Sequence, residues 1–329
     1  MTEPYDVTAI GNAIVDVIAS ATDDFLAAHN LNKGAMTLVG PGQSAALLGQ
    51  MAKGVETSGG SAGNTIAGIA SLGGKGAFVG KVADDRLGQV YRDEIAAIGA
   101  EYHSSGPLIG GPATGCCLIN VTPDAQRTMA TFLGAAGEVS PADIDPALIE
   151  ASKIVYLEGY LFDPESARAA FAKAAGLARA SQRLIALTLS DAFVVERHRA
   201  ALLGFIESQV DILFANEAEL CALFETDFDS ALGAVRSIAR IAAITRSEKG
   251  SVACEGALVR SVPAEPIKQL VDTTGAGDQY AAGFCFGLAR GKPLPICGQL
   301  GSIAAAEVIS HVGPRPLVSL AGLAGKAGL

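Results

Sequence analysis

Short apolar runs alternate along most of the chain with longer Ala-rich segments of helical periodicity, and this alternation restricts the fold more than any other feature. The runs expected as strands cover residues 5–10, 77–79, 154–157, 184–189, 212–214 and 242–245. The segments expected as helices lie near residues 61–72, 86–98, 141–150, 164–180, 192–207, 216–224, 276–290 and 293–311. Such alternation predicts an α/β fold with a mainly parallel sheet covered by helices. The 329 residues suit one large domain with an appendage.

The stretch from residue 107 to 133 breaks the alternation. Its β-prone runs at 115–121 and 128–133 surround the sequence P-D-A-Q at 123–126, which favours a turn. We expect a hairpin set apart from the parallel core. Together with parts of residues 18–54, it is expected to form a small β-sheet lid inserted in a single domain of residues 1–329. Such a lid would cover the carboxyl edge of the main sheet, where open α/β sheets bind ligands.

The composition excludes several classes of partner. A formal net charge of −10 with scattered Lys and Arg argues against a nucleic-acid-binding surface, because phosphate backbones are held by basic patches. The six cysteines form no C-x-x-C pair, and no histidines stand at zinc-ligand spacing, which is typical of reduced thiols in a cytosolic protein. The N-terminus lacks a basic leader, and no apolar run is long enough to cross a bilayer. We therefore expect a soluble cytoplasmic protein that binds neither nucleic acid nor membrane.

A glycine-bearing turn at residues 272–278, D-T-T-G-A-G-D, opens an apolar segment of helical spacing. The backbone N–H groups of Gly275, Ala276 and Gly277 would lack intrahelical partners, and with the helix dipole they would form a cradle for phosphate charge. Asp278 would lie beside that cradle as a base, with a pKa that the helix N-terminus should lower. Capping of the helix by one of the two threonines is the alternative explanation, but it leaves the two glycines unexplained.

A second glycine-rich turn, G-G-S-A-G-N at residues 59–64, also leads into a predicted helix. Small residues there would let a ligand approach the backbone closely, and the amide at its end offers both donors and an acceptor. Tight packing of the helix on the sheet explains the glycines equally well. The candidate ligand-binding residues of this turn are Gly59, Gly60, Ser61 and Asn64.

Three common nucleotide or hydrolase signatures are missing. No G-x-x-x-x-G-K-[ST] sequence occurs, and the turn after the first strand lacks the glycines of a dinucleotide fingerprint. No G-x-S-x-G elbow occurs either, which disfavours an α/β hydrolase. Any phosphate site must therefore be of another kind.

Asp16 follows the first predicted strand in a run that is otherwise apolar. A lone carboxylate in such a run needs a partner. The two hydroxyls of a ligand diol would serve, because each carboxylate oxygen can accept one hydroxyl hydrogen. A surface position on an amphipathic strand is the alternative.

Two polar segments follow predicted strands at the same sheet edge. Asn216 and Glu219 begin a helix in a pattern that fits a capping box, but Glu219 could also lie, through water, near a phosphate-bound magnesium ion. The turn at residues 245–250 could contact the phosphates or ribose of a nucleotide, or be only a hairpin. Its candidate nucleotide-binding residues are Thr245, Arg246, Ser247 and Gly250.

The order of these motifs resembles that of the ribokinase-like (PfkB) family of carbohydrate and nucleoside kinases. The resemblance spans nearly the whole chain, and the last motif with its helix is its most specific element. It implies a three-layer α/β/α domain with a β lid, ATP as donor and Mg²⁺ as the metal. It further implies Asp278 as the base, residues 275–277 as the anion hole, Asn216 with Glu219 near magnesium and phosphate, and residues 245–250 against the nucleotide.

The same resemblance raises the question of a second metal ion. Many members of the family bind K⁺ between two loops that correspond here to residues 272–274 and 308–313, so Asp272 is a candidate ligand. Thr274, with the two glycines that follow it, would contact the nucleotide. The oligomeric state stays open between monomer and homodimer, because an edge of the lid could pair with another subunit or stay covered.

Within the family, several segments indicate the acceptor. G-N-A-I-V-D at residues 11–16 is closer to the G-N-P-L-L-D of adenosine kinases than to the G-S-I-N-A-D of ribokinases, and an apolar Ile14 suits a base better than a bare sugar. R-T-M-A-T at 127–131 is similar to the adenosine kinase lid strand R-S-L-x-A. The residues expected to contact the acceptor here are Asn12, Arg127, Met129 and Tyr160, besides Asp16 and the 59–64 turn.

Two departures keep a sugar acceptor open. Glu158 stands where ribokinase has a sugar-contacting glutamate and adenosine kinases do not, and Gly63 replaces a glutamine of the adenosine kinase pattern. We therefore expect phosphoryl transfer to the primary hydroxyl of a ribonucleoside, foremost adenosine. The alternatives are a sugar kinase of the ribose, fructose or 2-keto-3-deoxygluconate type, or a catalytically silent binding protein on the same fold. The intact G-A-G-D sequence argues against a silent protein.

Overall fold

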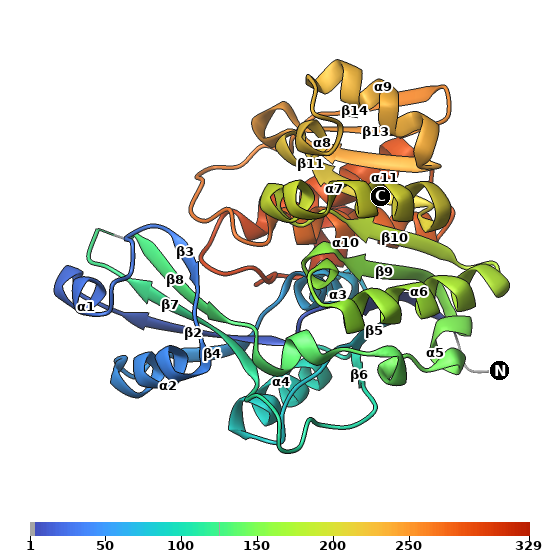
Figure 1. Ribbon diagram of the computed structural model, residues 1–329. Helices are drawn as coiled ribbons and strands as arrows, with labels where there is room; N and C mark the ends of the chain where they lie inside the picture. Colours follow the sequence, from blue (N-terminus) through green and yellow to red (C-terminus); the bar gives the residue numbers. More distant parts are fainter. Residues whose placement is uncertain (1–3, 125) are drawn as a thin grey trace.

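A nine-stranded sheet forms the centre of the molecule (Figure 1). The computed structural model describes residues 4–124 and 126–329. Parallel pairing runs from β6 across to β12, and a hairpin of β13 and β14 completes the sheet in antiparallel fashion. In spatial order the strands are β14 (Leu258–Val262), β13 (Ser251–Glu255), β12 (Ile241–Thr245), β11 (Ile212–Asn216), β10 (Leu184–Thr188), β9 (Ser152–Glu158), β1 (Tyr5–Ile10), β5 (Gly76–Val79) and β6 (Glu101–His103).

Helices cover both faces of this sheet and make three layers. Alternate side chains of β9 show the division, since Val155 and Leu157 join one apolar core while Ile154 and Tyr156 join the other. The first core lies under α5 (Pro146–Glu150), α6 (Glu165–Ala180), α7 (Ala192–Gln209), α8 (Glu217–Phe224) and α9 (Phe228–Ile238). The second lies under α3 (Ser61–Ser71), α4 (Arg86–Ala97), α10 (Ala276–Ala289) and α11 (Leu294–Val308), and α12 (Leu320–Lys326) packs on α11. The predicted α/β/α architecture is confirmed.

A smaller five-stranded sheet projects to one side of the main sheet (Figure 1). Its strands, in spatial order, are β3 (Met36–Leu38), β8 (Arg127–Phe132), β7 (Gly115–Val121), β2 (Ile14–Ser20) and β4 (Val55–Ser58). Helices α1 (Asp23–Ala28) and α2 (Pro41–Gln50) bury Leu26 and Leu47 in the same core as Val17 and Leu118 of this sheet. Asp16 alternates with Val17 along β2 and therefore lies on the opposite face of this sheet.

The predicted hairpin is present as β7 and β8. Ala125 of its predicted turn lies outside the described residues. The small sheet also takes β2 and β4, so it begins before residue 18 and extends past residue 54 of the expected segment. The apolar run around Asp16, which the sequence places just after the first strand, is β2 of this small sheet.

The predicted helix at 141–150 is wrong as a single element. Residues Pro141–Asp143 form a 3-10 turn, and the α-helix begins only at Pro146. Asp145 is extended, with φ −81° and ψ 117°, because the following proline disfavours helical backbone angles in the residue before it. Sequence periodicity also missed α9 and the β13–β14 hairpin.

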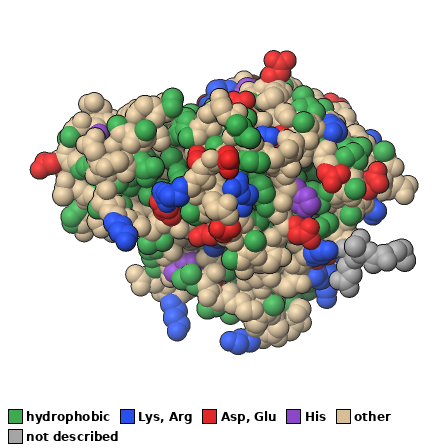
Figure 2. All heavy atoms as spheres, turned by 90° about the horizontal axis from the view of Figure 1, so that it is seen from below, with side chains coloured by type: hydrophobic (Ala, Val, Ile, Leu, Met, Phe, Trp, Pro, Cys, Tyr) green, Lys and Arg blue, Asp and Glu red, His purple; other side chains and the backbone are tan. Residues whose placement is uncertain are grey.

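Two features of the structure bear on the expected partners. None of the helices within the described residues combines the length and the apolar character needed to span a bilayer. On the face drawn in Figure 2, Lys and Arg side chains are interspersed with Asp and Glu and form no continuous basic area. A cytoplasmic location stays a prediction.

Candidate active site

The carboxyl ends of the parallel strands bring the sequence motifs together. β1 leads into the turn before β2, β9 ends at Glu158, and β11 ends at Asn216. Helices α3 and α10, which begin at the two glycine-rich turns, pack against each other (Figure 1). Motifs more than 200 residues apart therefore meet at one edge, as the parallel topology requires.

The start of α10 contains two glycines with different roles. Gly275 has φ +79°, and a Cβ on it would lie 2.7 Å from the Cα, Cβ and carbonyl oxygen of Pro314, so the fold itself requires glycine there. Gly277 has no such conflict, because a Cβ on it would meet no atom within 4 Å. Packing gives no reason for this glycine. Open space above the first turn of a helix is what close approach of a phosphate would need.

The expected cradle of N–H groups is partly used by the turn itself. The Ala276 N–H donates to the Thr273 carbonyl at 3.2 Å. Among the described residues, the N–H groups of Gly275 and Gly277 have no hydrogen-bond partner. These two are the ones available to a ligand at this helix end.

Asp278 lies in the first turn of α10 and is held from the start of α3. Its Oδ1 accepts from the Ser61 hydroxyl at 2.6 Å, and its Oδ2 accepts from Asn64 Nδ2 at 2.9 Å. Burial raises the pKa of Asp278, while these two donors act in the opposite direction. The expectation that the helix N-terminus would leave a lowered pKa is therefore wrong, because desolvation outweighs it. A raised pKa makes the carboxylate a stronger base.

Asp16 is the second buried carboxylate, and it stands on β2 of the small sheet. A Cβ on Gly59 would lie 2.5 Å from its Oδ2, so Gly59 is needed to seat this side chain. No hydrogen bond to the carboxylate is found within the described residues. Burial raises its pKa to about 7, with the charges of Arg315 and Arg127 acting against the rise and Asp278 adding to it. Such a bare acceptor is suited to ligand hydroxyls.

Glu158 has no accessible surface and is fully engaged by the chain. Its Oε1 accepts from Asn12 Nδ2 at 2.7 Å and from the Asn12 backbone N–H at 3.2 Å, and its Oε2 accepts from the Ala62 N–H at 2.8 Å. It thereby joins the turn after β1 to the start of α3. Gly60, at φ +82°, packs on the Asn12 carbonyl in the same joint. We propose that Glu158 and Asn12 support the acceptor loops from below.

Arg127 connects the small sheet to the loop before α10. Its Nη1 contacts the Asp272 carboxylate and lies 3.2 Å from the Thr274 hydroxyl. Burial alone would raise the pKa of Asp272, but donors from Thr274 and Gly313 and the charge of Arg127 lower it. Asp272 thus has protein partners on both oxygens, and binding of K⁺ by this residue stays a prediction. Met129, two residues along β8, lies on the same face as Arg127.

Asn216 and Glu219 form the capping box that their spacing predicts. Glu219 N–H donates to Asn216 Oδ1 at 2.8 Å, and the Asn216 N–H and Nδ2 donate back to the carboxylate at 3.0 and 2.7 Å. Burial raises the pKa of Glu219 to about 7, and the charges of Asp191 and Asp278 add to the rise. A cation arriving with a triphosphate would relieve this repulsion. Within the described residues, no cluster of three or more His, Cys, Asp or Glu could hold a metal alone.

The turn at 245–250 joins β12 to β13 beside this capping box. Arg246 pairs with Glu217 at 2.9 and 3.1 Å, and its guanidinium lies 3.8 Å from the centre of the Phe228 ring. Gly250, at φ +81°, meets the backbone of β14 and is required by the hairpin. The hairpin is thus present, and contact of Thr245, Ser247 or Arg246 with a nucleotide stays a prediction. Tyr160 follows β9 and is 37% exposed on this side of the edge.

Three structural partners of the site could not be found from sequence patterns. Gln279 donates from Nε2 to the Asn64 and Pro314 carbonyls at 2.9 and 3.0 Å. Glu94 of α4 accepts from Ser58 and Thr57 just before the 59–64 turn. Arg315 reaches Asn64 from the loop after α11. Only the position of Gln279 directly after Asp278 offered a signal.

Comparisons with known proteins agree with this geometry. Residues 31–319 match the family described as pfkB family carbohydrate kinase. The chain belongs to this family. Its structure is similar to the adenosine kinase from Sinorhizobium meliloti, with a TM-score of 0.90 and 49% identity over 98% of this chain and 99% of that one. A probable sugar kinase protein from Rhizobium etli gives a TM-score of 0.91 and 43% identity over 100% and 99%.

A curated relative extends the comparison. The adenosine kinase of Saccharomyces cerevisiae is 28% identical over 95% of this chain and 97% of its own length. The pfkB family kinase described here is thus a phosphotransferase with an alcohol group as acceptor, and the family implies ATP as a substrate.

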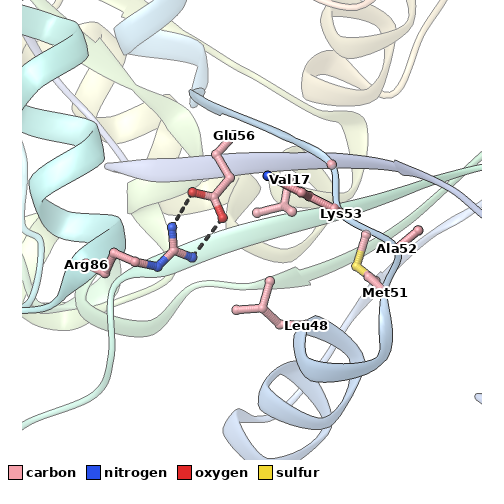
Figure 3. A pocket seen from close by; sticks show the side chains of 8 residues that line it. Val17, Leu48, Met51, Ala52, Lys53, Glu56 and Arg86 are labelled. Carbon is pink, nitrogen blue, oxygen red and sulfur yellow. Dashed lines mark hydrogen bonds and ion pairs between the residues drawn. The ribbon is translucent and has the colours of Figure 1, made fainter.

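A surface hollow of about 370 Å³ lies away from this site (Figure 3). It opens between the end of α2, β4 and Arg86, on the face of the small sheet opposite to Asp16. An ion pair of Arg86 with Glu56 spans it and ties α4 to β4. None of the candidate catalytic residues of the kinase lines it, so it is not the substrate site.

Proposed function

We propose that this kinase transfers the γ-phosphoryl group of magnesium-ATP to the primary hydroxyl of a ribonucleoside, foremost adenosine, which would become AMP. The observation that carries the proposal is Asp278, fixed by Ser61 and Asn64 at 2.6 and 2.9 Å beside the open helix end at Gly277. A base and an anion-binding helix end side by side are what phosphoryl transfer to a hydroxyl requires.

The chemistry follows from these positions. Asp278 orients the acceptor hydroxyl and takes its proton as the new O–P bond forms and the bond from the γ-phosphorus to the bridging oxygen of ADP breaks. The N–H groups of Gly275 and Gly277 donate to the phosphoryl oxygens during transfer. Glu219 would hold magnesium through water, and the ion would supply positive charge against the triphosphate. Positioning and charge stabilisation supply most of the rate.

Support for a nucleoside acceptor comes from the other side of the site. Asp16 offers a bare carboxylate to a ribose diol, and Ile14 beside it is apolar and buried. Glu158, the residue that favoured a sugar, has both oxygens occupied by Asn12 and Ala62. Met129 and Tyr160 are the apolar surfaces proposed for the base. Similarity to a protein described as a probable sugar kinase keeps a sugar acceptor as the competing function.

The first experiment measures ADP production from magnesium-ATP against adenosine, inosine, guanosine, cytidine, ribose, fructose and 2-keto-3-deoxygluconate, in Na⁺ and in K⁺. We expect turnover with adenosine. Asp278→Asn should lower kcat by about 100- to 10,000-fold with ATP binding largely intact. The matched control is Asp229→Asn, which removes an exposed aspartate from the first turn of α9 and should leave kcat unchanged.

The outcomes separate the alternatives. If only a sugar is phosphorylated, Asp278 stays the proposed base, but the acceptor is a sugar and not a nucleoside. Near wild-type kcat in Asp278→Asn would remove Asp278 as the base. Ligand binding without turnover would favour a silent binding protein. A higher rate in K⁺ than in Na⁺ would support a monovalent cation near Asp272.

A further inference from the structure

Arg315 lies at the end of a short segment that touches both halves of the site. One residue earlier, Pro314 packs against Gly275, and its carbonyl accepts from Gln279 at 3.0 Å. Gly313 donates to the Asp272 carboxylate at 3.1 Å. Residues 313–315 thus pack along the turn before α10. The side chain of Arg315 is only 14% exposed and lies at the start of α3.

The guanidinium of Arg315 fixes which way the Asn64 amide points. Arg315 Nε donates to Asn64 Oδ1 over 3.5 Å, while Asn64 Nδ2 donates to Asp278 Oδ2 at 2.9 Å. A flipped amide would set its oxygen against the Asp278 carboxylate and its NH₂ against the guanidinium. Both neighbours therefore select the same orientation, and Arg315 reinforces the donor that Asp278 receives.

The same guanidinium fills the space left by the unusual glycine of the 59–64 turn. A Cβ on Gly63 would lie 2.8 Å from the Tyr91 hydroxyl and 3.6 Å from Arg315 Nη2. The nearest acidic group on α4, Glu94, is 3.9 Å from Arg315 Nη1, and Nη2 is buried without a partner. Arg315 is thus only loosely paired with Glu94. The Tyr91 hydroxyl next to it also lies 3.5 Å from the carbonyl oxygen of Gly59, the glycine that seats the bare carboxylate of Asp16.

We propose that Arg315 is a positioning residue of the acceptor site, which orients the Asn64 amide toward Asp278 and supplies the positive charge that keeps Asp16 ready to accept hydroxyl hydrogens. The kinetic part of this inference rests on the proposed function, whereas its electrostatic part does not. Arg315 opposes the burial that raises the pKa of Asp16, and burial lowers the pKa of Arg315 itself. The titratable groups that face Asp16 from the surrounding elements are Arg315 after α11, Arg127 on β8, Asp278 on α10, Tyr91 on α4 and Cys117 on β7.

The direct test follows the titration of Asp16 by carboxyl ¹³C NMR in protein labelled at aspartate, with Asp16→Asn to assign the signal. Arg315→Met should move the midpoint of Asp16 upward by about one pH unit or more, because an opposite charge is lost from a buried carboxylate. Arg315→Lys keeps a charge and should move it less. Arg290→Met is the matched control, since that arginine contacts Asp6 and the Phe286 ring and should not affect Asp16.

Kinetics test the orientation of Asn64 with whichever acceptor the wild type phosphorylates fastest. Arg315→Met should lower kcat/KM for the acceptor by about 10- to 100-fold, the range expected for a lost hydrogen bond to a charged group, with the KM for ATP changed less than about twofold. Arg315→Lys cannot present the planar fork, so it should stay about tenfold below wild type despite its charge.

The NMR titration and the kinetics test separate parts of the inference. An Asp16 midpoint that is the same in wild type and Arg315→Met would overturn the inference, whatever the acceptor. Equal losses in acceptor and ATP parameters, with a lowered Tm and an unmoved Asp16 midpoint, would reduce Arg315 to a structural residue. Absence of nucleoside turnover in the wild type would overturn the proposed function while the NMR titration still decides the role of Arg315.

Discussion

The start of α10 and the middle of β2 each carry a carboxylate at the proposed acceptor site, and the two carboxylates have different partners in the chain. Asp278 receives two donors from α3 before any substrate arrives. The side chain of Asp16 is 9% exposed and receives no hydrogen-bond donor from the described residues. A carboxylate already held by the chain has a fixed direction, which suits a base. A carboxylate left bare gains its partners only from a ligand, which suits recognition.

The difference between the two carboxylates is tested most strongly by removing Asp16, which we expect to recognise the acceptor. Asp16→Ala should lower kcat/KM for a ribonucleoside by about 100-fold or more, because two charge-assisted hydrogen bonds are lost. The 2′-deoxyribonucleoside should lose much less, so that discrimination between the two nearly disappears. Steady-state kinetics with both nucleosides measure this.

The control for Asp16→Ala is Glu56→Ala on the neighbouring strand β4, which removes a carboxylate paired with Arg86 on the far face. It should leave the discrimination intact. Unchanged discrimination in Asp16→Ala would remove Asp16 from the acceptor site and would break the comparison.

Local sequence features predicted both carboxylates, because each lies inside its own motif. Asp278 is three residues after a glycine that only a special turn requires, and Asp16 interrupts an apolar run. Six strands of the main sheet, β1, β5, β9, β10, β11 and β12, were predicted because their apolar runs are continuous in sequence, whereas β6, β13 and β14 were not. The roles of these residues needed the resemblance to a family as well.

The supporting residues could not be predicted, because their contacts are far apart in sequence. Arg315 contacts Asn64 across 251 positions, and Glu158 contacts Asn12 across 146. Neither arginine nor glutamate has a local pattern that reports such partners. Glu158 was expected at the substrate, whereas the structure encloses it beneath the loops. The split of the 141–150 helix was readable in principle from Pro146.

A smaller loss of activity is expected when the open space at the start of α10 is filled by a methyl group. Gly277→Ala should lower kcat/KM by about 10-fold or more, because the added methyl group occupies the space through which a phosphoryl group approaches. The same change should raise the free energy of unfolding by up to about 1 kcal/mol, since alanine is the better helix former and meets no atom within 4 Å.

Gly176→Ala in α6 is the matched control for Gly277→Ala. A Cβ there also meets no atom within 4 Å, and the site is far away, so stability should rise with unchanged kinetics. If Gly277→Ala behaves like Gly176→Ala in both measurements, the open space at Gly277 has no part in phosphoryl transfer.

The last prediction concerns the stability of the fold and its dependence on pH. The pKa of Asp16 is raised from its ordinary 3.8 to about 7, so the folded protein binds this proton more tightly than the unfolded chain does. The ionised side chain therefore destabilises the fold in full above about pH 7, and the penalty fades as pH falls toward 3.8. Asp16→Asn should raise the Tm by several degrees at pH 8, corresponding to a few kcal/mol, and by much less at pH 5.

Asp278→Asn is the matched variant for Asp16→Asn, because it removes the charge from the carboxylate that already has donors from the chain. An amide at 278 would turn its NH₂ toward a donor of Ser61 or Asn64, so part of any gain from removing the charge is lost again. Asp278→Asn should therefore gain less in Tm at pH 8 than Asp16→Asn. Thermal unfolding at pH 5 and pH 8 without ligand measures both. Equal gains would mean that the donors from α3 do not distinguish the base from the bare carboxylate, and that burial alone governs both residues.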